Sequence, residues 1–181
     1  MSELRVNRII PRDGLPVGAS GGGIIQVVQS VETGTATMTG GGTPLSVMSA
    51  SITLTSSSSK VLVLVDMNVG SSNGYNTSIY LYRAGTKVYF GDAATNRPSV
   101  SKTANIYGSA ATTYMQIPVQ IHYLDSPGVS PGTSVTYDVR IASYGSVGAS
   151  FNRSWGDLND PTNSQFDGRN ASSVTLMEVS V

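Results

Sequence analysis

Apolar and polar residues alternate with a period of two along most of the chain beyond residue 23. Such alternation places successive side chains on opposite faces of a β-strand. Clusters of Gly, Pro, Asn and Ser separate the alternating segments, as expected for turns. The pattern therefore predicts a series of short strands, with the clearest alternation in residues 24–31, 77–83, 114–124 and 135–141.

Further strand signals lie at residues 45–48, 52–55, 61–69, 87–90 and 173–181. The first half of 61–69 is apolar on both faces, which is typical of a central strand in a sandwich. Within 114–124 we expect Met115 to point inward with the other apolar residues, and Pro118 favours an edge strand or a bulge because proline has no backbone donor. Residues 91–107 and 152–172 are predicted to be long loops. No segment of ten or more residues has helical periodicity.

Eight or nine short strands separated by turns predict an all-β fold, an antiparallel β-sandwich with a jelly-roll-like head, over residues 23–181. Residues 1–22 form a separate unit, because they contain too few apolar groups to fold alone and lead into the head through the triglycine 21–23. This segment is either a disordered leader or an extended arm that orders on a neighbouring subunit, where its arginines could pair with carboxylates.

The charge balance narrows the possible partners. The chain has 11 basic and 11 acidic residues and no basic stripe, which argues against nucleic-acid binding. No apolar run approaches the ~20 residues of a membrane-spanning helix, so membrane insertion is not expected. Cysteine is absent, which excludes disulfides and thiolate-bound metal.

Catalytic chemistry finds little support in the sequence. The single histidine, His122, lies on the polar face of a predicted strand, and no Gly-x-Ser-x-Gly elbow or phosphate-binding glycine loop precedes a helix. The acidic segment 157–163 offers oxygen ligands for Ca²⁺ but lacks EF-hand spacing, so a hydrogen-bonded surface loop is the preferred interpretation. Glycoside hydrolysis by Asp157, Asp160 or Asp167 is the weaker alternative. We therefore expect no enzyme, no metal and no cofactor.

The segment 151–170 is more interesting as a recognition surface, because it combines aromatic, charged and amide side chains. Aromatic rings stack on sugars, polar groups hydrogen-bond their hydroxyls, and binding residues concentrate in loops on rigid scaffolds. Alternatively, Trp155 and Phe166 plug the end of the sandwich or pack at a subunit contact. The candidate recognition residues are Arg153, Trp155, Asp157, Asn159, Phe166 and Arg169.

Several stretches resemble, in their order and spacing, a family of short structural proteins and fibre-tip domains of marine and cyanobacterial tailed bacteriophages. They are residues 23–29, 52–55 with the serine tract and 60–65, 91–97, 124–128, 136–139 and 174–179. The leading segment 5–16 resembles the N-terminal arms that anchor such proteins to the virion. The anchoring residues that this likeness implies are Arg5, Arg8, Ile9, Ile10, Pro11, Arg12 and Asp13.

The resemblance implies a homotrimeric tail fibre or appendage, assembled in the host cytoplasm and then extracellular on the virion. Its arm would dock on other virion proteins, and its head would contact a glycan or protein of the host surface. Tyr80 and Tyr82 are candidates for the trimer interface, with packing against the second sheet as the alternative. No collagen-like or coiled-coil shaft separates arm from head, so a capsid decoration protein that stabilises the shell is the second possibility.

Overall fold

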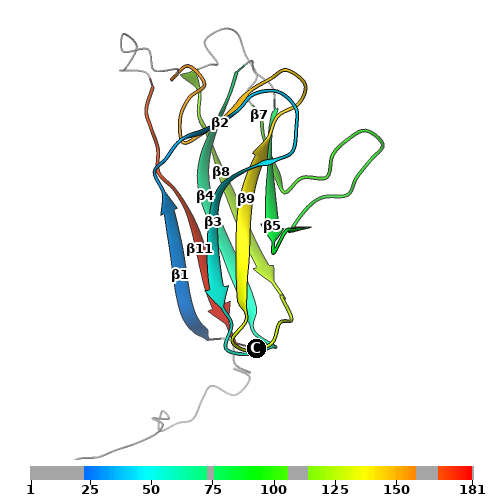
Figure 1. The fold of residues 1–181 in the computed structure, drawn as a ribbon, viewed down its shortest axis with the longest axis vertical. Coiled ribbons are helices and arrows are strands. Elements are labelled where there is room, and N and C mark those ends of the chain that lie inside the picture. Colours follow the sequence, from blue (N-terminus) through cyan, green and yellow to red (C-terminus); the bar gives the residue numbers. More distant parts are fainter. Residues whose placement is uncertain (1–22, 73–75, 106–113, 158–166, 181) are drawn as a thin grey trace, which may run out of the picture.

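The computed structural model describes residues 23–72, 76–105, 114–157 and 167–180. These residues form two antiparallel sheets that pack against each other around one core, with no α-helix among them (Figure 1). The predicted all-β sandwich is thereby confirmed. The described part of the chain contains no helix suited to crossing a membrane.

Sheet A is built around the longest strand, β4. Its main strands, in hydrogen-bonded order, are β1 (Ile24–Glu32), β11 (Ser172–Val179), β4 (Lys60–Ser71) and β8 (Ile117–Asp125). Beyond the N-terminal end of β11, the short strand β10 (Ala149–Phe151) pairs with the same edge of β4. A second short strand, β2 (Ala36–Met38), pairs with β10 in turn. In the described residues, β1 pairs with β11 alone and β8 with β4 alone, so these two strands are the edges.

Sheet B contains β3 (Leu45–Thr53), β9 (Ser134–Ala142) and β5 (Asn76–Arg83) in that order. The edge of β5 that faces away from β9 pairs with β7 (Lys102–Asn105) along its first half and with β6 (Thr86–Val88) along its second half. A register shift between Ser46 and Met48 marks a β-bulge in β3.

The connections between the sheets follow a jelly-roll path. From β1 to β5 the main strands alternate between sheets A and B, the chain stays in sheet B through β6 and β7, and β8, β9 and β11 alternate again. Sheet A has four main strands, and in sheet B the short strands β6 and β7 together take the fourth position beside β3, β9 and β5. Two four-stranded sheets connected in this order form a jelly roll. Because most connections between the long strands cross from one sheet to the other, the loops gather at the two ends of the sandwich (Figure 1).

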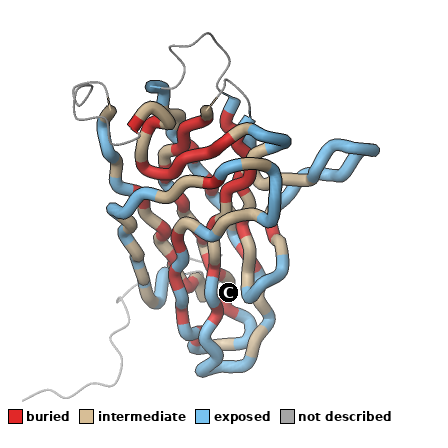
Figure 2. The backbone as a smooth tube through the Cα atoms, turned by 45° about the horizontal axis from the view of Figure 1, so that its top comes forward, coloured by how far each residue is buried: buried red, intermediate tan, exposed pale blue. Residues whose placement is uncertain are grey.

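The core lies between the inward rows of the two sheets, where buried positions alternate with exposed ones along each strand (Figure 2). On β4 the inward row consists of valines and one methionine, from Val61 to Val69, and all are at most 1% exposed. Across the core, Ile79 and Leu81 of β5 are completely buried. Each fully buried side chain of this size stabilises the fold by roughly 1.5–3 kcal/mol.

Some local predictions were wrong. The predicted loop 91–107 contains β7, whose sequence has no apolar alternation; only Ala104 is buried, and hydrogen bonding to β5 creates the strand. The segments 45–48 and 52–55 form one bulged strand, and the short strands β2 and β10 were missed. Met115, predicted to point inward, precedes β8 and is 45% exposed.

A buried carboxylate links the two sheets. Asp125 of β8 is 3% exposed and accepts hydrogen bonds from the Tyr137 hydroxyl at 2.6 Å and from Arg83 Nη1 at 2.7 Å. Burial raises the pKa of Tyr137 far above its ordinary value, and the bond to Asp125 raises it further. The tyrosine therefore remains a hydrogen-bond donor further into alkaline solution than an exposed tyrosine would.

A second buried carboxylate joins strands at the end of the sandwich where β1 begins and β11 ends, the lower end in Figure 1. Glu178 of β11 is completely buried and accepts hydrogen bonds from Gln26 Nε2 of β1 at 2.5 Å, and from the amide and hydroxyl of Thr55 at 2.8 Å each. Burial alone would raise the pKa of Glu178, but these donors outweigh it and hold the pKa at about 2. The ionised carboxylate thus joins β1, β11 and the segment after β3.

We expect Glu178→Gln to lower the free energy of unfolding at neutral pH by about 1–3 kcal/mol, because bonds to a charged acceptor become weaker neutral ones. The folded-state pKa of about 2 lies below the ordinary 4.5. The carboxylate therefore stabilises the fold above pH 4.5 and loses this effect as the pH falls toward 2. Urea unfolding should show the wild-type advantage shrinking over that range.

Asp66→Asn removes an exposed carboxylate from the same sheet and serves as the control. If wild type and Glu178→Gln differ by the same amount at pH 4.5 and at pH 2, the ionised carboxylate does not stabilise this end of the sandwich.

Candidate functional site

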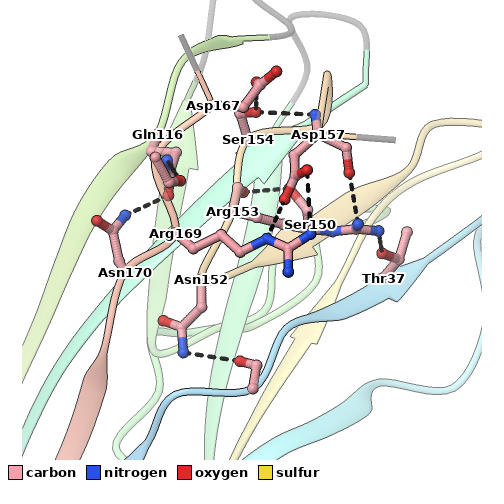
Figure 3. A network of polar contacts seen from close by, with 12 residues as sticks. Thr37, Gln116, Ser150, Asn152, Arg153, Ser154, Asp157, Asp167, Arg169 and Asn170 are labelled. Atoms are coloured by element: carbon pink, nitrogen blue, oxygen red, sulfur yellow. Dashed lines mark hydrogen bonds and ion pairs between the residues drawn. The ribbon is translucent and has the colours of Figure 1, made fainter. Parts of the chain in front are cut away.

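Three surface features bear on function: the polar cluster in residues 149–172, a cleft on the outer face of sheet B, and the outer face of sheet A. The polar cluster contains three of the residues that the sequence suggested for recognition, Arg153, Asp157 and Arg169, and Figure 3 shows it from close by. It lies at the upper end of the sandwich in Figure 1, opposite the end where Gly23 and Ser180 are hydrogen-bonded to each other.

Asn152 fixes the chain where it leaves β10. It is completely buried with φ of +57°, a left-handed conformation that asparagine tolerates better than most residues. Its Nδ2 donates to the carbonyl oxygens of Glu32 at 2.8 Å and Gly34 at 3.1 Å, and its Oδ1 accepts from the Ser172 hydroxyl at 2.5 Å. One side chain thus holds the ends of β1, β10 and β11 together.

Asp157 connects the two predicted arginines. Arg169 Nε donates to Asp157 Oδ2 at 2.8 Å, and Arg153 Nη1 donates to the Asp157 carbonyl oxygen at 2.6 Å (Figure 3). The hydrogen bond and the charge of Asp157 raise the pKa of Arg169. Arg153 Nη2 also donates to the Thr37 hydroxyl of β2. The structure thus brings Arg153, Asp157 and Arg169 together, and their bonds are made to one another and to the scaffold.

Trp155 packs against the backbone of Gly148. A Cβ built on Gly148 would lie 2.0–2.8 Å from three atoms of the indole ring, so only glycine leaves room for it. Trp155 is half-buried. This contact agrees with the packing alternative for Trp155, whereas Asn159 and Phe166 lie outside the described residues. A recognition role for this loop stays a prediction.

The side chains of Tyr80 and Tyr82 lie on the outer face of sheet B, because Ile79 and Leu81 of the same strand point into the core. The alternative that these tyrosines pack against the second sheet is therefore wrong. The Arg140 guanidinium carbon lies 4.2 Å from the Tyr82 ring centre, and the two tyrosine rings are 6.4 Å apart. Their predicted place in a trimer interface stays a prediction.

A cleft of about 650 Å³ opens on this outer face beside Tyr80. Sequence reasoning missed it, because its walls come from β5 and from the loops after β2, β6 and β9. The one local signal was Tyr144, an aromatic residue in a Ser-Tyr-Gly-Ser segment of turn-forming residues. The cleft residues of most chemical interest are Gly41, Tyr80, Asn96, Pro98, Ser143 and Tyr144.

The outer face of sheet A is crossed by a row of apolar side chains. Val27, Met177, Leu62 and Leu124 are cross-strand partners from β1, β11, β4 and β8 in turn. Val27 and Leu124, at the two ends of this apolar row, are 55% and 50% exposed. The sequence prediction of a central strand was right for β4, but the described residues supply no third layer over its outer leucines. His122 is exposed on the same face, as expected.

No protein-family model matches this chain, and no curated protein matches it either. In the described ranges, no three His, Asp or Glu side chains form a group that could hold a metal ion. What the protein does is therefore inferred from the surfaces described above.

We expect Gly148→Ala to destabilise the fold by about 1–3 kcal/mol, since the added methyl group must displace the Trp155 ring or the backbone. Trp155 is the only tryptophan of the chain, so its fluorescence should report the displacement as a red-shifted emission with a lower melting temperature. Gly168→Ala is the matched control, because nothing lies within 4 Å of its added Cβ. Unchanged emission and melting in Gly148→Ala would contradict this placement of the ring.

Proposed function

We propose that this protein is a non-enzymatic structural component of a tailed-phage particle that assembles as a homotrimer through the outer face of sheet A. The apolar row across this face is the observation that carries the proposal. An enzyme needs a constellation of reacting groups, whereas a particle component needs surfaces that attach it to its neighbours. The apolar row suits the second requirement.

The exposure of apolar side chains on this sheet supports a buried state in the assembled protein. Ile24, Ile25, Val27 and Val31 of β1 are each about half exposed or more. Monomeric proteins rarely expose contiguous apolar patches larger than a few hundred Å². The edges of β1 and β8 also carry backbone groups that favour pairing with other chains unless they are covered. Association of copies removes both liabilities.

The position of the most exposed residues favours a cyclic assembly. The two ends of the apolar row lie on different strands, Val27 on β1 and Leu124 on β8. A contact between the β8 side of one copy and the β1 side of the next covers both ends with one kind of interface. Such a head-to-tail contact closes into a ring when the rotation between copies fits. The phage resemblance implies three copies.

The two ends of the head suit different tasks. Ser180 N donates to the Gly23 carbonyl oxygen at 2.9 Å, so Gly23, the first described residue, lies beside the end of β11 at the lower end of the sandwich (Figure 1). An extended segment of the length of residues 1–22 reaches about 70 Å. We propose that this segment anchors the protein to the particle through the basic stretch from Arg5 to Asp13. The upper end, with the loops of residues 149–172, would then face outward.

A capsid decoration protein is the second candidate. It is favoured by one feature of the chain: residue 22 is followed almost at once by β1, with no shaft to lift the head away from the particle. A head held close to its anchor suits a protein that bridges shell subunits. In either role the arm attaches the protein to the particle, and the head contacts neighbouring subunits.

We expect the full-length protein to sediment as three chains of 18.8 kDa and Leu124→Lys to sediment as one. The substitution places a charge at the half-exposed end of the apolar row, where burial would leave it unpaired. Thr103→Lys on the exposed edge strand β7 is the control and should keep the trimer mass. A monomeric wild type, or a trimer insensitive to Leu124→Lys, would refute this interface.

We expect a protein lacking residues 1–22 to keep the trimer mass and the wild-type melting temperature but to be missing from purified particles. The reason is that the buried core of the described residues is built from side chains between Met48 and Leu176. Immunogold labelling with antibodies against residues 23–181 measures incorporation, and label on the tail or on the shell separates the two roles. Normal incorporation of the truncated protein would disprove the anchoring role.

A further inference from the structure

The cleft on the outer face of sheet B has the features of a binding site. Its volume of about 650 Å³ lies within the range of small-molecule sites. Its floor is formed by Ser78 and Tyr80 of β5 and by Ala142 at the end of β9. The loops that follow β2, β6 and β9 form its walls, so four separate parts of the chain converge on one hollow.

Tyr144 is an exposed aromatic side chain at this cleft. It is 88% exposed, the largest value among the exposed large hydrophobic residues of the described chain. An aromatic ring in water gains nothing for the fold, since stabilisation requires burial of its apolar area. A ring presented in this way at the rim of a hollow is suited to stack on a ligand. Tyr80 supplies a second, half-buried ring from the floor.

The loop that carries Tyr144 is held in place. Gly145 has φ of +63°, and its carbonyl oxygen accepts a hydrogen bond from the Gly41 amide of the facing loop. A Cβ on Gly41 would come within 3.0 Å of the Gly145 nitrogen, so the two backbones touch. The Ser143 hydroxyl donates to the Val147 carbonyl oxygen at 2.5 Å. A preorganised wall lowers the entropic cost of binding.

The opposite wall is also braced. Lys87 Nζ donates to the carbonyl oxygen and the hydroxyl of Ser99 at 2.8 and 2.7 Å, which ties the segment after β6 to that strand. Within this segment, Arg97 N donates to the Ala94 carbonyl oxygen at 2.9 Å and closes a tight turn. Asn96 lies in this turn and lines the cleft.

The residues that line the cleft carry no charge. They offer two tyrosine rings, the Asn96 amide, the hydroxyls of Ser78 and Ser143, and glycine backbone. The ammonium group of Lys87 lies 5.7 Å from the Tyr80 ring centre but is bonded to Ser99. A phosphate or carboxylate ligand would need cationic partners, whereas a neutral ligand rich in hydroxyl groups needs apolar faces for its rings and amides for its hydroxyls.

We propose that this cleft binds a neutral saccharide, with Tyr144 stacking on a sugar ring, Asn96 hydrogen-bonding its hydroxyls and the Ser143 oxygen accepting a hydrogen bond from one of them. The inference rests on the proposed function as a component of a phage particle, for which the resemblance implies a head that contacts the host surface, and it gives that contact a site and a ligand class. The site differs from the predicted recognition loop, because Arg153, Asp157 and Arg169 bond to one another and to the scaffold. It also leaves the outer face of sheet A free for assembly.

The full-length protein is applied to an array of neutral oligosaccharides and of sialylated or sulfated ones. We expect retention on neutral oligosaccharides, with affinity reduced at least tenfold in Tyr144→Ala and largely kept in Tyr144→Phe, which retains the ring. The melting temperature of Tyr144→Ala should equal that of wild type, because the side chain is exposed. Tyr114→Ala, at a 41% exposed tyrosine outside the cleft, is the control and should bind normally.

Retention of no oligosaccharide, or of anionic ones alone, would overturn the proposal. Neutral binding that survives Tyr144→Ala but is lost in Trp155→Ala would overturn it too, and would move recognition to the loop of residues 151–170. Because binding is measured on purified protein, it is independent of particle attachment and trimer mass. If the protein binds neutral sugars through Tyr144 but never joins a particle, the proposed function is wrong while the saccharide-binding proposal for the cleft is supported.

Discussion

The inward row of β4 is the element on which the rest of the fold depends. From Val61 to Val69 every second side chain is buried between the sheets, and the same strand hydrogen-bonds to β11 and β10 on one edge and to β8 on the other. Few other positions in the chain contribute both to the core and to so many strand pairings. The polar clusters at Asp125 and Glu178 are consistent with this arrangement, because they join the strands around β4 at points where the apolar core ends.

The two sheets share one core but have different outer faces. Sheet A presents the apolar row, from Val27 to Leu124, while sheet B presents hydroxyls, tyrosines and the Asp138–Arg140 ion pair. Apolar area favours burial against another protein, whereas a hydrated face with hollows is suited to small polar ligands. We infer that the jelly roll separates assembly and recognition onto opposite faces, so that neither surface has to serve both.

Glycine and asparagine fix the loops at the upper end more than apolar packing does. Gly148 leaves room for the Trp155 ring, Gly41 lets two loop backbones touch, and Asn152 adopts a left-handed conformation while bonding to three neighbouring segments. These contacts tie the described parts of the loops to the strands and to one another. A rigid loop is a requirement for display, because a mobile surface loses binding free energy to ordering.

The sequence by itself determined the strands with strong alternation and the all-β class, because period-two burial is a local property that needs only neighbouring residues. It also pointed correctly to the central position of β4 and to the exposure of His122. It did not reveal β7, which forms by pairing with β5 and buries Ala104 alone, nor the order of strands in the sheets, which depends on pairings between distant segments. The apolar row and the cleft at Tyr144 were likewise decided by the tertiary structure, since each gathers side chains from four parts of the chain. The sequence proposed Arg153 and Asp157 for recognition, which stays a prediction, and only the folded loop showed that they also bond to the scaffold and to each other.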